Sequence, residues 1–130
     1  MSINLRPVIF TALLVATTGM YGCGNPDPVI ESSELVVRIQ SGTAPLILDV
    51  RTPEEYSAGH IPGAINITHT ELGERLGELE AHKSDEIVVH CRSGHRAGLA
   101  ETVLADAGFT GVRDLDGHML GWEENGYPVE

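Results

Sequence analysis

The sequence predicts an α/β fold with a mainly parallel sheet, and three observations lead to this expectation. Residues 45–50 and 87–89 are nearly continuous apolar runs, which is typical of strands buried on both faces of a parallel sheet. Stretches with helix-start signals or with apolar residues at helical spacing separate these runs. At 130 residues the chain is long enough for one domain with a single core. We therefore expect strands and helices to alternate along one domain.

Local signals mark the remaining elements. Thr52 and Glu55 fit a capping box, and a proline stands between them at the first helical position. Ser32 or Ser33 is expected to cap the first helix, and Thr70 a later one. Besides the two apolar strands, the expected elements are a helix over 34–40, a helix beginning at 52–55, a strand over 64–67, a helix over 71–81, a helix over 96–104, an edge strand over 111–115 and a helix over 117–125.

Composition and charge exclude several classes of function. The formal net charge is −11, so nucleic acid and anionic membrane surfaces are not expected as partners. The chain has two cysteines, Cys23 and Cys91, and no CxxC pair, which removes thioredoxin-like and zinc-ribbon interpretations. The histidines match no compact metal-ligand spacing, so no metal site is expected. Those considered are His60, His90, His95 and His118.

The N-terminal part has the layout of a secretory signal. Residues 1–22 contain one arginine, a short apolar run and then small residues, which predicts a signal peptide. Residues 20–23 resemble the lipobox of bacterial lipoproteins, in which the cysteine, here Cys23, receives a lipid. Residues 23–28 would then be the attachment point and a tether, and residues 29–130 the folded domain. We expect an exported protein in the periplasm or cell envelope, held to the membrane only by that lipid. An ordinary cleaved signal and an uncleaved anchor are the alternatives.

Cys91 stands where a strand meets the start of a helix. Backbone N–H groups in such a loop can turn inward and bind an anion, and the helix dipole adds to the effect. Arg92 and Arg96 add positive charge, and together these groups favour a thiolate. A buried, inert core cysteine is the alternative. A core cysteine has no need of two arginines and His95 nearby, so we favour a reactive thiol.

Several parts of the chain form one pattern: residues 48–51, 56–67, 91–96, 115–117, Trp122 and 126–129. In this order they resemble the motifs of the rhodanese family. One departure is His118, where a second glycine is common in that family. The resemblance implies a small doubly wound α/β domain with helices on both faces and the cysteine loop at the carboxyl edge of the sheet.

The resemblance also implies sulfurtransferase chemistry without a metal or organic cofactor. The Cys91 thiolate would take the outer sulfur of a donor such as thiosulfate and pass it from a persulfide to cyanide or a thiol. Two arginines suit a doubly charged inorganic donor, so we expect thiosulfate to be preferred over 3-mercaptopyruvate. The substrate-binding residues expected around Cys91 are Arg92, Ser93, Gly94, His95 and Arg96.

Two other functions remain open at this stage. A phosphatase or arsenate reductase loop places its arginine after five intervening residues, whereas Arg96 follows Cys91 after four and Ala97 holds the phosphatase position. A non-catalytic rhodanese-like module, used for binding or as a sulfur carrier, is the closer rival. An exported thiol without a disulfide partner must rest as a persulfide or be kept reduced by a thiol reductant partner.

Other polar and aromatic residues are expected to have structural roles. Arg51 is expected to form an ion pair with Glu54 or Glu55. His60 lies in a predicted turn, and Trp122 is expected to anchor the last helix to the core.

Overall fold

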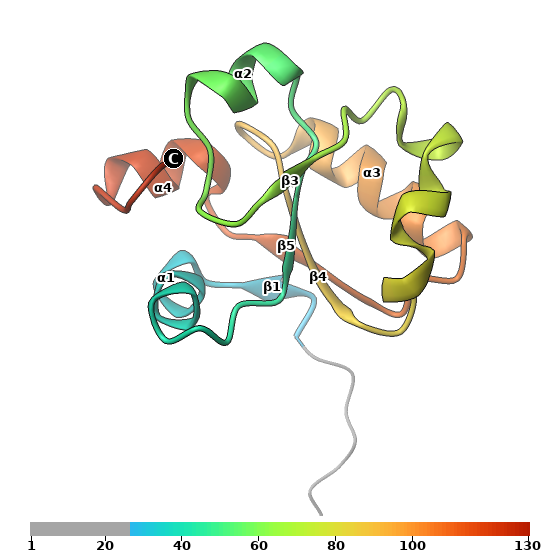
Figure 1. Cartoon of the computed structure of the whole chain (residues 1–130), viewed down its shortest axis with the longest axis horizontal. Helices are drawn as coiled ribbons and strands as arrows, with labels where there is room; N and C mark the ends of the chain where they lie inside the picture. The colour runs from blue at the N-terminus through green and yellow to red at the C-terminus, as the bar shows by residue number, and fades with distance from the viewer. Residues whose placement is uncertain (1–26) are drawn as a thin grey trace, which may run out of the picture.

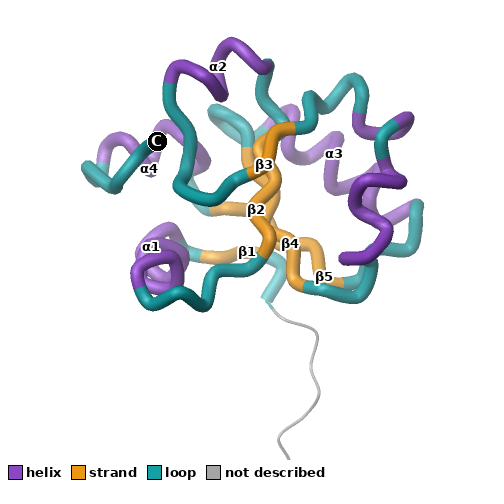
Figure 2. The backbone as a smooth tube through the Cα atoms, in the orientation of Figure 1, coloured by secondary structure: helices purple, strands orange, loops and turns teal. Residues whose placement is uncertain are grey.

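The computed structural model describes residues 27–130, which form a five-stranded, wholly parallel sheet. The strand order is β1-β5-β4-β2-β3, so the strand that leads to Cys91 is central (Figure 2). The predicted signal peptide and the Cys23 attachment site lie outside the described residues. The strands are β1 (Val29–Ile30), β2 (Leu46–Asp49), β3 (Ile65–Asn66), β4 (Glu86–His90) and β5 (Gly111–Leu115).

Helices cover both faces of the sheet, as the predicted doubly wound fold requires (Figure 1). Helices α1 and α4 pack on one face, and α3 with the 3₁₀ helices η1 and η2 packs on the other. Helix α2 follows β2 at the carboxyl edge. The helices are α1 (Ser32–Gln40), α2 (Pro53–Ala58), η1 (Leu72–Glu74), η2 (Leu76–His82), α3 (His95–Asp106) and α4 (His118–Glu124).

The central strand shows why an unbroken apolar run was needed. Successive side chains of a strand point to opposite faces. Ile87 and Val89 therefore enter the cluster under α3, with Leu104 and Phe109. Val88 enters the other cluster, which lies under α1 and α4. Because both faces are covered, all three residues are fully buried, as expected for a central parallel strand.

The capping box predicted at the start of α2 is confirmed. The Glu55 N–H donates to Thr52 Oγ1 at 3.2 Å, and the Thr52 N–H donates to Glu55 Oε1 at 3.3 Å. Pro53 is the first helical residue, where its missing N–H costs nothing. The helix after β2 thus begins where the sequence places it.

The helix predicted over 71–81 is wrong. The segment forms two 3₁₀ helices that meet at Arg75, and Thr70 does not cap either of them. Gly73 and Gly77 lie within this segment, and glycine weakens an α-helix because of its backbone entropy. Its buried leucines, Leu72 and Leu79, still pack on the sheet, so the tighter turns keep the apolar contacts.

Two further expectations need correction at the start of the domain. The strand over 111–115 is not an edge strand, because β1 pairs outside it through Val29–Asp114 and Ile30–Leu115. Two residues are too few to give a periodic signal. Helix α1 begins at Ser32 with Glu31 as its N-cap, and no side chain caps it.

Gly111 is required by close packing between backbones. A Cβ on Gly111 would lie 2.3 Å from the Asp85 carbonyl oxygen, a contact that demands a backbone shift. We expect Gly111→Ala to lower the free energy of unfolding by about 1–3 kcal/mol, measured by urea denaturation. Gly98→Ala is the matched control, since Gly98 lies exposed in α3 with open space around it. That change should raise the stability by about 0.5–1 kcal/mol. Equal effects of the two substitutions would contradict this account.

Candidate active site

Cys91 directly follows β4, and its sulfur is enclosed by the backbone of the next turn. The Gly94 N–H donates to Cys91 Sγ at 3.0 Å, and the backbone N–H groups of Ser93 and Ala97 also lower the pKa of the thiol. Cys91 is only 1% exposed. A buried sulfur surrounded by N–H donors is an environment that favours the anion over the neutral thiol.

Gly94 allows the turn to close around the sulfur. Its φ of 123° lies in a region that residues with a side chain rarely adopt. A Cβ at this position would also lie 3.1 Å from His118 Nε2. The position therefore needs glycine both for the backbone conformation and for the approach of His118.

The pKa of Cys91 is lowered from 9.0 to about 6. Burial by itself raises the pKa of this thiol, but a hydrogen bond to His118 and the three loop N–H groups outweigh it. A thiolate therefore predominates at neutral pH. The expected N–H groups of the loop contribute, but the side chain that lowers this pKa most is His118 and not Arg92 or Arg96.

Arg96 is held by Glu55 instead of standing free beside the sulfur. Its guanidinium donates to both carboxylate oxygens, at 2.6 and 3.1 Å. The hydrogen bond with Arg96 lowers the pKa of Glu55 to about 2, so both groups stay charged. The positive charge expected near Cys91 is thus largely balanced, and the pair instead joins α2 to the start of α3.

The ion pair expected between Arg51 and Glu54 or Glu55 is wrong. Arg51 Nη2 lies 2.7 Å from Asp49 Oδ2, and the two side chains are almost fully buried. The same nitrogen donates to the Gly59 carbonyl at 2.8 Å. Arg51 therefore fixes the turn after α2 against the end of β2.

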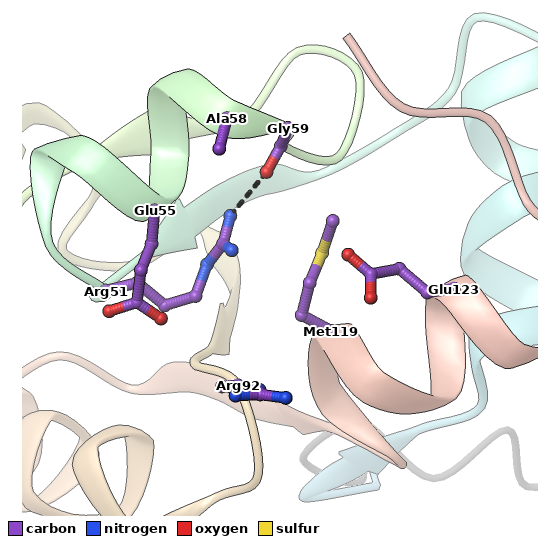
Figure 3. A pocket seen from close by; sticks show the side chains of 7 residues that line it. All are labelled: Arg51, Glu55, Ala58, Gly59, Arg92, Met119 and Glu123. Atoms are coloured by element: carbon purple, nitrogen blue, oxygen red, sulfur yellow. Dashed lines mark hydrogen bonds between the residues drawn. The ribbon is translucent and has the colours of Figure 1, made fainter.

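The remaining loop residues named from the sequence are exposed. Ser93 and His95 face solvent, and Arg92 lines a cavity of about 230 Å³. Within residues 27–130, no ion pair involves Arg92. Figure 3 shows Arg92 on one side of this cavity, with side chains from α2 and α4 around it. Cys91 does not line the cavity but adjoins it through Arg92. The lining residues are Arg51, Glu55, Ala58, Gly59, Arg92, Met119 and Glu123.

His118 was not among the residues predicted to form the site. It is the first residue of α4 and is 6% exposed. Its Nδ1 accepts a hydrogen bond from the Cys91 N–H at 3.3 Å, and its Nε2 lies 3.4 Å from Asp114 Oδ2. A sequence signal was present, since this position departs from the glycine common in the family that the chain resembles. Only the fold brings the ring to Cys91, 27 residues away.

Two structural expectations are confirmed. His60 stacks on Tyr56 with ring centroids 3.8 Å apart, and its Nδ1 lies 2.9 Å from the Tyr56 carbonyl. Trp122 is fully buried, and its Nε1–H donates to the Pro128 carbonyl at 2.8 Å. Both therefore stabilise the fold and do not enter the site.

Two further kinds of site were sought in the described part of the chain. No three potential metal ligands among residues 27–130 lie together. Over the same residues, no helix has the length and apolar character needed to cross a bilayer.

The fold and the site define a parallel α/β domain with a thiolate loop at the carboxyl edge of its sheet. Residues 32–125 match the sequence model of the rhodanese-like domain. The chloroplast thiosulfate sulfurtransferase 16 of Arabidopsis thaliana is 44% identical over 93 residues, which are 64% of this chain and 78% of that protein. The human single-domain sulfurtransferase TSTD1 superposes with a TM-score of 0.64 at 35% identity, covering 75% of this chain and 96% of the other.

This chain belongs to the rhodanese-like domain family. Proteins with a different domain organisation also contain this domain. An HTH-type transcriptional regulator of Mycobacterium tuberculosis is 44% identical over 109 residues, which are 82% of this chain and 46% of the regulator. The chain also spans about half the length of two further curated relatives.

The pair between Glu55 and Arg96 should make stability depend on pH. Because the pKa of Glu55 is lowered from 4.5 to about 2, its contribution is present above pH 4.5 and is lost as the pH falls toward 2. We expect Glu55→Gln, which preserves the capping box, to lower the free energy of unfolding by about 1 kcal/mol at pH 7. Urea denaturation should show that this difference shrinks in acid.

Glu78→Gln is the matched control for this measurement. Glu78 pairs with Arg75 on the exposed surface of η2, so its removal should change stability little at either pH. A difference between wild type and Glu55→Gln that stays constant in acid would contradict the assignment.

Proposed function

We propose that this chain is a sulfurtransferase that moves sulfane sulfur through a persulfide on Cys91. The observation that carries the proposal is the buried Cys91 sulfur, which accepts a hydrogen bond from the Gly94 N–H at 3.0 Å and whose pKa is lowered to about 6. A thiolate at neutral pH is the nucleophile that this reaction needs. Relatives named as sulfurtransferases support the same chemistry.

The first half of the reaction loads the cysteine. The Cys91 thiolate attacks the outer sulfur of thiosulfate, the S–S bond of the donor breaks, and sulfite leaves with the electron pair. The outer sulfur remains on Cys91 as a persulfide anion, within reach of the N–H groups that Ser93, Gly94 and Ala97 turn toward the site. These donors are fixed before the reaction, so they need no reorganisation to stabilise the charge.

Arg92 is the residue best placed to attract the donor. It borders the cavity beside Cys91, whereas the charge of Arg96 is balanced by Glu55. The remaining loop residues, Ser93 to Arg96, would bind the donor mainly through their backbone. A cysteine that is only 1% exposed suits a small donor, which supports thiosulfate over a carboxylate such as 3-mercaptopyruvate.

The structure also weighs against the phosphatase alternative. Phosphate transfer by such a loop would need the arginine that ends it, here Arg96, free to clamp the equatorial oxygens, and Arg96 is engaged by Glu55. The binding or sulfur-carrier alternative predicts a folded domain whose Cys91 does not turn over. The experiment below separates the two.

We expect the protein to form thiocyanate from thiosulfate and cyanide. Cys91→Ser should lower kcat/KM at least about a thousandfold, because the hydroxyl is not ionised at neutral pH. Urea denaturation of the variant serves as the control for folding. In the same assay, thiosulfate should give a higher kcat/KM than 3-mercaptopyruvate.

Two other outcomes of this assay would contradict the assignment as an enzyme. A folded wild type with no turnover, and with no added sulfur on Cys91 by mass spectrometry, would remove it. Loading without turnover would favour the sulfur-carrier function.

The proposal includes export and lipid attachment at Cys23. It is supported by the signal-like residues 1–22 and by the lipobox-like residues that end at Cys23. A domain tethered in the cell envelope would meet its donor and its thiol acceptor, or a thiol reductant, outside the cytoplasm.

Lipid attachment can be tested in a bacterial host supplied with labelled palmitate. The full chain should incorporate the label and sediment with membranes, whereas Cys23→Ala should do neither. Cys91→Ser is the matched control and should be labelled like wild type. Labelling that survives Cys23→Ala would contradict attachment at this residue.

A further inference from the structure

We propose that His118 is a catalytic residue, which pairs with the Cys91 sulfur and relays the proton of a thiol acceptor when the persulfide is discharged. Asp114 is its positioning residue. The inference rests on the proposed sulfur transfer and adds a proton-transfer step to it. It starts from contacts that join the ends of three elements, β4, β5 and α4.

The geometry forms a line from the sulfur to a carboxylate. The Cys91 N–H donates to His118 Nδ1 at 3.3 Å, which places the ring beside the cysteine, and the ring lowers the pKa of the thiol. On the other side, Nε2 lies 3.4 Å from Asp114 Oδ2. A nucleophile, a base and a carboxylate that orients the base are the parts of a nucleophilic triad.

The backbone conformation of His118 also indicates that its contact with Cys91 has a functional role. Within residues 27–130, it is the one non-glycine residue with a positive φ, 51°. Left-handed backbone is unfavourable for residues with a side chain and persists where the surroundings enforce it, often at active sites. Glycine, common at this position in the family, would avoid the strain but would leave no ring beside Cys91.

The charged groups around His118 come from every element packed against it. Asp114 on β5 and the Cys91 thiolate raise the pKa of His118 to about 9, although burial opposes this. Glu101 on α3 faces Asp114, and burial together with that neighbour raises the pKa of Glu101 to about 8. At neutral pH, Glu101 is therefore mostly a neutral carboxyl.

Two further titratable groups lie close by. His90 stays uncharged because burial lowers its pKa, so it does not repel a charged His118. The negative charge of Cys91 helps to raise the pKa of Arg96, but the guanidinium of Arg96 is bound by Glu55. The free site thus holds a thiolate beside an imidazolium.

The two protonation states of the ring differ in one contact. A neutral ring with its proton on Nε2 faces Asp114 with that proton and accepts the Cys91 N–H at Nδ1. A charged ring has a proton on Nδ1 as well, so it gives up the hydrogen bond from the Cys91 N–H and directs this proton toward the Cys91 side chain. Gain and loss of the proton at Nδ1 therefore exchange one contact with Cys91 for another, while Nε2 stays beside Asp114.

The discharge step then balances in protons and electrons. The imidazolium gives its proton to the outer sulfur of the persulfide anion, and the neutral ring takes the proton of the acceptor thiol. The resulting thiolate attacks the outer sulfur, the S–S bond to Cys91 breaks, and its electron pair returns to Cys91 Sγ. The products are the acceptor's persulfide, the Cys91 thiolate and His118 as imidazolium. Cyanide needs no such step, because it attacks as an anion and leaves as thiocyanate.

A comparison of a thiol acceptor with cyanide therefore distinguishes proton transfer by His118 from a role in stabilising the Cys91 thiolate. His118→Asn keeps a polar side chain that tolerates left-handed backbone, but it cannot exchange a proton in this range. His82→Asn is the matched control, since His82 lies 3.1 Å from Asp85 in a surface His–Asp pair away from the site. Each protein is first loaded with thiosulfate, and the discharge rate is then measured with glutathione and with cyanide.

We expect His118→Asn to slow discharge to glutathione about a hundredfold and discharge to cyanide no more than about tenfold, because the poorer Cys91 leaving group affects both acceptors and the lost proton transfer affects only the thiol. Alkylation of Cys91 by iodoacetamide, followed against pH, should show its midpoint rise by about one unit or more from the wild-type value near 6. His82→Asn should match wild type in both measurements. An unmoved midpoint, or an equal loss with both acceptors, would overturn the inference.

Failure of the proposed function gives a different result. If Cys91 cannot be loaded with sulfur, both the proposed transfer reaction and its proton-transfer step are contradicted. The pH dependence of alkylation still measures whether His118 stabilises the Cys91 thiolate. A midpoint that rises in His118→Asn would then support the thiolate–imidazolium pair alone.

Discussion

The site depends on the polar groups that stabilise a buried sulfur anion. A charge removed from water is stable only where other groups replace its hydration. For Cys91, these groups are the N–H donors of the following turn and the ring of His118. The left-handed conformation of Gly94 closes that turn, and the absence of a Cβ makes room for the ring. Substitution of Gly94 or His118 would therefore directly change the surroundings of the sulfur.

The parallel sheet explains how residues distant in sequence meet at this sulfur. All five strands end at the same edge, where the crevices of open α/β sheets form. The residue after β4 is Cys91, the end of β5 supplies Asp114, and the first residue of α4 is His118. The N–H of Met119 also donates to the Cys91 carbonyl at 3.1 Å, so α4 is tied to the loop through its backbone.

The charged side chains around the loop divide into two roles. The pairs Arg51–Asp49 and Arg96–Glu55 connect neighbouring segments and balance their own charges. Arg92 faces the cavity and has no such partner among the described residues. Hydrogen bonds and one imidazole thus lower the pKa of the thiol, while Arg92 is the arginine beside the cavity that is left without an ion-pair partner among residues 27–130.

The sequence alone was sufficient for the parallel α/β fold, the capping box at Thr52 and the position of Cys91 between strand and helix, because these follow from local pattern. It could not specify the partners of Arg51 and Arg96, since ion pairs depend on which segments the fold brings together. The two-residue strand β1 was too short for any periodic signal. The role of His118 was decided by tertiary structure for the same reason: its ring meets Cys91 only after β5 and α4 have packed beside β4.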